Sequence, residues 1–346
     1  MQLLITGGLG FLGIQTARQF LKCGRAWSPS LRAPAPLTQL TLFDKHIPTE
    51  PMPVDVIHDP RVRIRSGLIT DAEVIEELVE ESELAVIHLA SMVSGDSETS
   101  PFKAWEVNVD AQRVLLDTLH RVSPRARFVF TSSTATFGPV APRAPPPGDF
   151  TKQQPRNTYG FHKVVCEMML NDYSRQGLID GRGLRLPVVV VRPGAPNKAL
   201  TTCWSSVVRD PLSNKDVSIP VPADSRMPVA SYQIVVRALE QMMNTVSSEE
   251  LGFDKMLTLP AVSASPRELY DAAARLAAER DLPIGKLHEE LDPVATRVVQ
   301  GMGSQVDGDR ALGLGILQDE SVDSIVRSYA DDFVFGGVEL EDIEVI

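Results

Sequence analysis

Residues 3–13 read Leu3-Leu4-Ile5-Thr6-Gly7-Gly8-Leu9-Gly10-Phe11-Leu12-Gly13 and decide the fold. A short apolar run breaks into glycines, and apolar residues then resume at helical spacing, which predicts a buried strand, a tight turn and a helix. Gly7, Gly10 and Gly13 form a G-x-x-G-x-x-G pattern. Glycine permits the turn and lets the backbone approach a pyrophosphate at the helix N-terminus, where free N–H groups and the helix dipole favour an anion. The stretch therefore predicts a dinucleotide site.

An acidic residue ends the next expected strand, Leu40-Thr41-Leu42-Phe43-Asp44. At a strand end, Asp44 can accept hydrogen bonds from both adenosine ribose hydroxyls, and its charge repels a 2′-phosphate, which favours NAD over NADP. The interval from Gly13 exceeds the ~20 residues usual for this pattern, and the proline-rich stretch 27–36, expected to be a surface loop, accounts for the excess. The alternative is an ordinary turn aspartate, which the preceding glycine turn makes the second choice.

The composition is that of an ordinary globular protein of 346 residues, 43% of them hydrophobic. The formal net charge of −11 argues against a nucleic-acid partner bound through its phosphates. Three cysteines suggest neither a disulfide framework nor a metal site. The first strand starts at once, without a signal peptide, and no apolar run is long enough to span a bilayer, so we expect no membrane partner and a cytoplasmic protein.

Strand and helix patterns alternate over roughly the first 200 residues. Strands are expected at 62–64, 84–90, 127–131 and 188–191, and helices at 72–81, 101–121 and from 158 onward. Such alternation predicts an α/β fold, a Rossmann-type doubly wound parallel sheet, followed by a smaller C-terminal α/β substrate lobe. We expect the NAD-binding domain to cover residues 1–193, with 225–250 packing back on it. The substrate lobe would then comprise mainly 194–224 and 251–346.

Tyr159 and Lys163 are four residues apart, so both project from one face of the expected helix. Tyrosine has an ordinary pKa near 10, and an ammonium group one turn away should lower it. With a serine hydroxyl from the neighbouring strand end holding the substrate oxygen, the phenolate could remove an alcohol proton while a hydride leaves for a nicotinamide. The alternative, a surface Tyr–Lys pair, is disfavoured by the preceding glycine turn, Asp44 and Thr131-Ser132-Ser133.

Other polar residues allow two interpretations. His88, at the end of an apolar run, is more often a satisfied core histidine than a catalyst. A small hydroxy acid needs a cation for its carboxylate, and a bidentate arginine suits it best. Arg226 is the candidate, with a solvated turn arginine as an equal alternative. The hydroxyl partners of the substrate would be Ser94, Ser133 and Asn197.

The motifs together resemble the extended short-chain dehydrogenase/reductases, also called the NAD-dependent epimerase/dehydratase family. The matching motifs are residues 6–13, Asp44, residues 88–90, Asn108, residues 130–138, Tyr159-Gly160-Phe161-His162-Lys163 and Arg192-Pro193-Gly194. The resemblance implies a catalytic set of Ser133, Tyr159 and Lys163, with Ser133 chosen over Ser132 by counting back from Gly138. It also implies that NAD contacts the following residues: Gly7, Gly10, Phe11, Leu12, Asp44, Leu68, Leu89, Ala90, Asn108, Tyr159, Lys163 and Pro193.

Four further segments, residues 91–98, 183–187, 192–199 and 221–226, resemble dehydrogenases that use NAD to oxidise the 2-hydroxyl of a four-carbon sugar acid such as D-erythronate. This narrower likeness implies a substrate site that includes Ser94, Gly95, Ser133, Asn197 and Arg226, and no metal. The chain departs from it at Gly67, where the family often has an acidic residue, and at Met227-Pro228-Val229, which replaces a His-Trp-His-like segment.

Two other functions use the same fold. A sugar-nucleotide epimerase or dehydratase with tightly held NAD has the same Tyr–Lys pair. A non-catalytic NAD-sensing regulator usually lacks one of the two residues, and this chain has both. Family members commonly pair through the helix of Tyr159, so its apolar stripe with Met168 and Met169 predicts a homodimer; the alternative is burial in the core of the same subunit.

Overall fold

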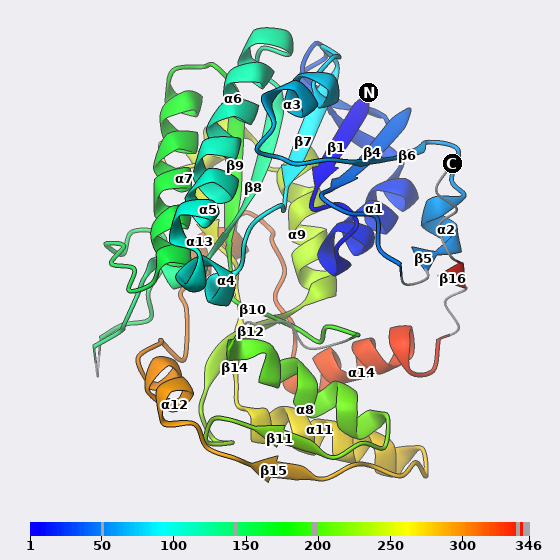
Figure 1. Ribbon diagram of the computed structural model, residues 1–346, viewed down its shortest axis with the longest axis vertical. Helices are drawn as coiled ribbons and strands as arrows, with labels where there is room; N and C mark the ends of the chain where they lie inside the picture. Colours follow the sequence, from blue (N-terminus) through cyan, green and yellow to red (C-terminus); the bar gives the residue numbers. More distant parts are fainter. Residues whose placement is uncertain (50–51, 142–143, 195–199, 337–339, 342–346) are drawn as a thin grey trace.

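The computed structural model describes residues 1–49, 52–141, 144–194, 200–336 and 340–341. A large sheet flanked by helices fills the upper part of the molecule, and a smaller lobe lies below it (Figure 1). No helix in the described part of the chain is long and apolar enough to cross a bilayer.

The large sheet has seven strands in the order β13-β9-β8-β7-β1-β4-β6, and every neighbouring pair is parallel. The predicted doubly wound parallel sheet is therefore confirmed. Because the strands are parallel, their carboxyl ends meet at one edge, where such sheets bind ligands. The strands are β1 (Gln2–Thr6), β4 (Gln39–Asp44), β6 (Val62–Ser66), β7 (Leu84–His88), β8 (Arg127–Ser133), β9 (Asp180–Leu186) and β13 (Met256–Thr258).

Helices cover both faces of this sheet (Figure 1). Alternate residues of β1 belong to different cores, since Leu3 and Ile5 pack on one face and Leu4 on the other. One face carries α1 (Phe11–Cys23), α2 (Val54–Ile57) and α9 (Tyr232–Asn244). The other carries α3 (Ala72–Leu78), α5 (Pro101–Trp105), α6 (Ala111–Val122) and α7 (Thr158–Arg175). The helix expected over 101–121 is thus present, but a π-helical turn at Glu106–Asp110 separates α5 from α6.

The lobe has its own core around the buried Trp204. Its three-stranded sheet has the order β10-β12-β14, and a two-stranded sheet joins β11 to β15. The strands are β10 (Val188–Val190), β11 (Val217–Ile219), β12 (Met227–Ser231), β14 (Val262–Ala264) and β15 (Leu287–Glu289), and the helices are α8 (Cys203–Leu212), α11 (Pro266–Glu279), α12 (Pro293–Gln300) and α14 (Val322–Phe333). Within 251–346, the range expected to form mainly the lobe, β13 pairs with β9 in the large sheet.

Shorter elements connect these parts. They are β5 (Met52–Pro53), α4 (Ser94–Thr99), a 3₁₀ turn (Thr134–Thr136), a second 3₁₀ turn (Leu200–Thr202), α10 (Ser248–Leu251), α13 (Asp309–Gly313) and β16 (Leu340–Glu341), which pairs with β5.

The expected surface loop at 27–36 is wrong, because this segment belongs to an antiparallel hairpin of β2 (Arg25–Ser28) and β3 (Ala33–Pro36). Pro34 and Pro36 stand at alternate positions of β3. The neighbouring Leu37 N–H donates to the Gly24 carbonyl across the hairpin (2.9 Å), which places the proline nitrogens on the side away from β2. A proline at such a position removes no ladder hydrogen bond.

Candidate active site

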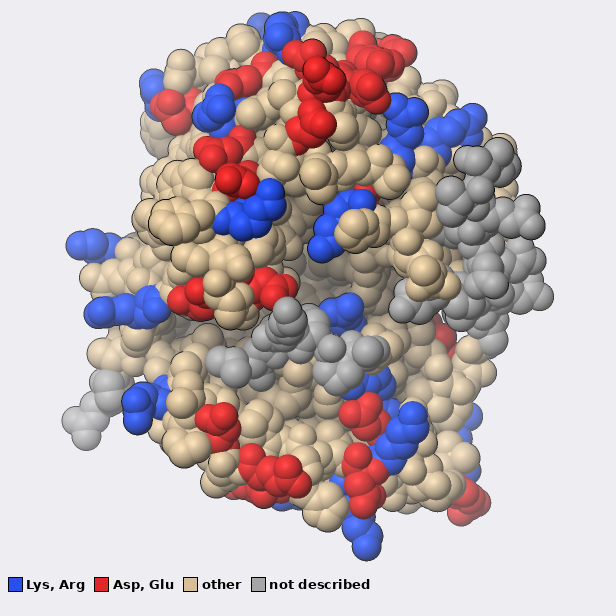
Figure 2. Space-filling view, in the orientation of Figure 1, with Lys and Arg blue, Asp and Glu red and all other residues tan. Residues whose placement is uncertain are grey.

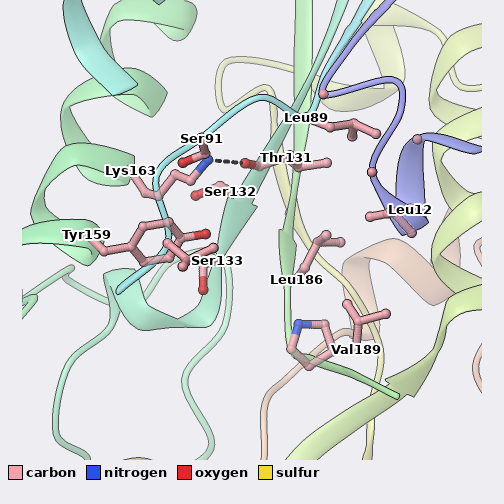
Figure 3. Close-up of a pocket in the computed structure, with 15 residues that line it drawn as sticks. Leu12, Leu89, Ser91, Thr131, Ser132, Ser133, Tyr159, Lys163, Leu186 and Val189 are labelled. Atoms are coloured by element: carbon pink, nitrogen blue, oxygen red, sulfur yellow. Dashed lines mark hydrogen bonds between the residues drawn. The ribbon is translucent and has the colours of Figure 1, made fainter. Parts of the chain in front are cut away.

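A pocket of about 300 Å³ lies at the carboxyl edge of the large sheet, between the glycine turn and α7 (Figure 3). It brings together the two motifs predicted to form the cofactor turn and the catalytic pair. Its lining residues are Gly7, Gly10, Leu12, Gly13, Leu89, Ser91, Val93, Thr131, Ser132, Ser133, Tyr159, Lys163, Leu186, Pro187 and Val189. Figure 2 shows this face of the molecule hollowed between its upper and lower parts, with acidic and basic side chains interspersed.

The three glycines of the turn are needed for different reasons. Gly7 has a φ of +69°, and a Cβ there would lie 2.9 Å from the Ala90 nitrogen. A Cβ on Gly13 would clash with the Gly7 carbonyl and lie 2.7 Å from the Gly8 backbone. A Cβ on Gly10 would only approach the Gly7 carbonyl to 3.4 Å, which is ordinary van der Waals contact. The fold thus requires glycine at positions 7 and 13. At position 10 the fold would accept a Cβ, but that Cβ would fill the cradle, which is the space in front of the turn that a ligand would occupy.

The first turn of α1 offers free N–H groups to this cradle. Gly10 caps the helix without a side-chain hydrogen bond, and no acidic residue lies in the first turn. Such an end favours an anion through its N–H groups and the helix dipole. Leu12 lines the pocket, while the Phe11 ring turns toward Tyr232 (5.1 Å between centroids) and Phe333 (6.0 Å). These features fit a dinucleotide pyrophosphate.

Asp44 and Leu68 lie next to each other in the fold, at the carboxyl ends of β4 and β6. Asp44 is opposite Ser66 in the parallel pairing, and its carbonyl accepts the Gly67 N–H (3.1 Å). Its carboxylate accepts the backbone N–H of Lys45 (2.8 Å) and has no second donor among the described residues, while Leu68 is 57% exposed. The geometry suits an adenosine bound beyond the glycine turn.

Ser133, Tyr159 and Lys163 converge in the pocket (Figure 3). Asn157 caps α7 by accepting the Gly160 N–H (2.7 Å), which fixes the start of the helix that carries the tyrosine and the lysine. The Ser133 hydroxyl lies beside the Tyr159 phenol (Figure 3) and lowers its pKa. The Lys163 ammonium donates to the Thr131 carbonyl (2.8 Å) and lies 5.4 Å from the centre of the Tyr159 ring.

The expected lowering of the tyrosine pKa by its lysine neighbour is not found. Burial raises the pKa of Tyr159 to about 12, and the neighbouring Ser133 hydroxyl only partly offsets it. Burial also lowers the pKa of Lys163 to about 8. The reason is geometric: the ammonium points at the Thr131 carbonyl, so it does not contact the phenol oxygen, and the phenol is protonated at neutral pH.

Two other polar residues singled out in the sequence form hydrogen bonds with neighbouring protein groups. His88 is buried, contacts the Thr6 hydroxyl through Nδ1 (2.7 Å), and its pKa falls to about 3 through burial, so it is a neutral core histidine. Asn108 lies in the π turn, and its amide bonds the main chain of Met92 (2.7 and 3.2 Å) and the Ser91 hydroxyl (3.1 Å). Its amide therefore holds the loop after β7, and its cofactor contact stays a prediction.

Arg226 does not reach this pocket. It pairs with Glu268 (2.7 Å) and donates to Ser263, and it lines a separate pocket of about 370 Å³. Among the other expected residues, Ser94 and Gly95 form the first turn of α4 beside the lining residue Val93. Ala90 lies directly after Leu89 and Pro193 four positions after Val189. Asn197 lies outside the described residues.

The sequence model of the NAD dependent epimerase/dehydratase family matches residues 3–252. The chain belongs to this family.

Two curated family relatives align over nearly the whole chain. D-erythronate dehydrogenase of Cupriavidus necator is 34% identical over 332 residues, which cover 96% of this chain and 98% of that protein. The enzyme of the same name from Haemophilus influenzae is 31% identical over 331 residues, 96% and 99% of the two chains. The chain is thus a dehydrogenase of the epimerase/dehydratase family, and its resemblance to the sugar-acid enzymes is confirmed.

Solved structures agree with this fold. The crystal structure of a protein named as a nucleoside-diphosphate-sugar epimerase from Agrobacterium tumefaciens has a TM-score of 0.84 and 30% identity, covering 98% of this chain and 96% of that one. L-threonine dehydrogenase from Clostridium difficile has a TM-score of 0.79 at 19% identity, covering 98% and 99%, and shows the common fold alone.

Several pocket residues of this family member escape sequence reasoning. Leu186, Pro187 and Val189 line the pocket from the crossing between the large sheet and the lobe. Leu186 and Pro187 precede the strand expected at 188–191 and Val189 lies within it, so no expected strand end points to them; β9, at whose carboxyl end Leu186 lies, is not among the expected strands. Ser91 lines the pocket although Ser94 is the serine expected there, because the turn between β7 and α4 cannot be located from the sequence.

Proposed function

We propose that this protein uses NAD to oxidise the 2-hydroxyl of a small sugar acid, such as D-erythronate, to the 2-oxo acid. The observation that supports it most is the convergence of Ser133, Tyr159 and Lys163 on the pocket formed by the glycine turn. The two D-erythronate dehydrogenases, aligned from end to end, support the substrate class.

NAD would bind along the carboxyl edge of the large sheet. Gly10 and the first turn of α1 would take the pyrophosphate, Asp44 the adenosine ribose, and Lys163 the nicotinamide ribose. When bound, the nicotinamide supplies the hydride acceptor. Leu12 and Leu89 on the pocket wall would exclude water beside it.

Tyr159 would exchange the proton of the substrate hydroxyl at its phenol oxygen. Its protonated phenol is suited to donate in the reduction of the 2-oxo acid, and in the oxidation it must first lose the proton. The positive charge of an oxidised nicotinamide in the pocket would lower the pKa of Tyr159 and so make the loss of its proton easier. Ser133, which lies beside the phenol, would hold the same substrate oxygen, and Lys163 would keep an ammonium group near the phenol.

The pocket size favours a small substrate. Its volume of about 300 Å³ is at the lower end of the range for ligand sites, and part of it would hold the nicotinamide. A sugar nucleotide would need a larger cleft and cations for its diphosphate. That second candidate, an epimerase with bound NAD, is favoured by the likeness to the Agrobacterium protein, which is named an epimerase.

For the substrate carboxylate we favour Arg192 over Arg226. Arg192 follows β10 at its carboxyl end, and its Nε is buried with no hydrogen-bond acceptor among the described residues. Burial and the neighbouring Arg209, which donates to the Arg192 carbonyl (3.2 Å), lower the pKa of Arg192. No described carboxylate pairs with it, so a bound acid would supply the missing partner. Arg226, by contrast, already has Glu268.

The subunits would pair through α7 and its neighbours. Phe161 and Met168, seven residues apart on one face of α7, are 49% and 57% exposed, and Phe102 on α5 is 87% exposed. Exposed apolar groups of this kind mark interaction surfaces. Light scattering would show a dimer, and Met168→Glu would shift it toward the monomer. The cytoplasmic location stays a prediction.

The test is a screen of four- to six-carbon aldonic acids with NAD, followed by the absorbance of the reduced nicotinamide. The proposal expects net NADH formation with D-erythronate or a close analogue. An epimerase with bound NAD would instead convert UDP-sugars with no net change in NAD.

A further inference from the structure

α7 carries three polar residues on a single face at four-residue spacing: Tyr159, Lys163 and Glu167. The proposed function uses the first two and leaves the third without a role. Glu167 is completely buried, and an ionised carboxylate in such a place requires compensating partners.

Those partners come from three other segments. The Ser132 hydroxyl donates to one carboxylate oxygen, Gln153 donates to the other (2.6 Å), and Arg185 contacts both (3.1 and 3.1 Å from Nε, 2.8 Å from Nη2). Ser132 lies in β8 and Arg185 in β9. The carboxylate therefore ties α7 to the carboxyl ends of two neighbouring strands of the sheet.

Ser132 is the middle residue of the strand end that touches the catalytic pair. On one side of it, the Thr131 carbonyl accepts a hydrogen bond from the Lys163 ammonium (2.8 Å), and on the other, Ser133 lies beside the Tyr159 phenol. A shift of Ser132 would move both contacts together.

The ion pairs continue away from the pocket. Arg185 contacts Asp149 (3.3 Å), and Asp149 contacts Arg310 of α13 (3.0 Å) and accepts the Thr258 N–H (2.6 Å). Two arginines and two carboxylates thus alternate behind the strand end, which fixes the position of the Glu167 side chain.

We propose that Glu167 is a positioning residue for the reaction: it holds Ser132, and with it Ser133 and the Thr131 carbonyl, against Tyr159 and Lys163. The proposal rests on the proposed function. The titratable groups that act on the charge of Lys163 or respond to it come from two elements: His88 from β7, and His162, Cys166 and Glu167 from α7. Because burial raises the pKa of Cys166 to about 12, the charge on α7 that acts on Lys163 comes from the Glu167 carboxylate.

The opposite ends of the same two strands provide a matched control. Asp180, at the start of β9, pairs with Arg127 (2.7 Å) and Arg182 and also bonds Ser248. It is a largely buried carboxylate held by two arginines, as Glu167 is held by its network, but it lies at the amino edge of the sheet. Asp180→Asn should cost stability without disturbing the pocket.

The experiment compares Glu167→Gln, Asp180→Asn and the wild type by thermal melting, NADH titration and reduction of the 2-oxo acid across pH. Glu167→Gln should lower kcat by roughly 10- to 100-fold, keep the Kd for NADH within about twofold of the wild type, and shift the alkaline limb of kcat/KM to lower pH. Asp180→Asn should change only the melting temperature. If Glu167→Gln matches Asp180→Asn in all three measurements, the residue is only structural and the proposal is overturned.

A crystal structure of Glu167→Gln separates this proposal from the proposed function. Should the wild type turn over no sugar acid, the proposed function fails, yet the structure still tests the positioning. A displaced strand end, in which the Thr131 carbonyl no longer accepts the Lys163 ammonium, supports the role of Glu167, and an unchanged strand end refutes it.

Discussion

Replacing Gly10 by alanine tests the dinucleotide cradle without disturbing the fold. Gly10 has φ −74° and ψ 166°, a conformation open to alanine, and the new Cβ would meet only the Gly7 carbonyl at 3.4 Å. At such a compatible site, Gly→Ala stabilises a protein by about 0.4–1 kcal/mol, so the melting temperature should stay constant or rise slightly. The methyl group would instead occupy the space that we assign to the pyrophosphate.

The expected loss is in cofactor binding. Displacing one charge-assisted hydrogen bond costs about 1.5–3 kcal/mol, which weakens the Kd for NADH roughly 10- to 100-fold. A fluorescence titration with NADH gives the Kd, and thermal melting of the same sample gives the melting temperature.

Gly13→Ala is the matched comparison. Its Cβ would clash with the backbone of Gly7 and Gly8, so it should destabilise the fold by about 1–3 kcal/mol. A Gly10→Ala variant that binds NADH as tightly as the wild type would refute the assignment of this turn to the pyrophosphate.

The remaining predictions concern specificity, substrate and pH. Asp44→Ala should weaken NAD and admit NADP, as measured by kcat/KM with each cofactor; an unchanged preference would count against the ribose contact. Arg192→Ala should raise KM for the acid at least about tenfold, which corresponds to a lost charged contact of ~1.5 kcal/mol, whereas Arg226→Ala should leave KM nearly unchanged; the reverse pattern would restore Arg226 as the carboxylate partner. In the reduction of the 2-oxo acid, kcat/KM should fall above about pH 8, because Lys163 loses its proton there while Tyr159, with a pKa of about 12, stays protonated. A flat profile to pH 10 would exclude a need for the ammonium.

The sheet and the glycine turn could be predicted from the sequence because each depends on local pattern. Residues 3–13 combine strand, turn and helix signals within one short segment, and Asp44 ends the strand expected after it. The spacing of Tyr159 and Lys163 was enough to place both on one face of a helix, and the structure puts both in the pocket.

The predictions that were wrong concern contacts between segments that are far apart in the sequence. The prolines of 27–36 indicated a loop, but their alternate positions fit an antiparallel hairpin. Helical spacing brought Lys163 near Tyr159 without showing that its ammonium points to Thr131 or that burial dominates the tyrosine pKa. Arg226 looked available because its partner, Glu268, lies 42 residues further along the chain.

The most direct test of the central claim is the rate of NAD reduction by D-erythronate with the wild type and with Tyr159→Phe. The account predicts NADH formation by the wild type, a loss of at least about 100-fold in kcat for the variant, and NADH affinities that agree within about twofold. Wild-type turnover that survives the loss of the phenol hydroxyl, or no turnover of any four- to six-carbon aldonic acid, would contradict it.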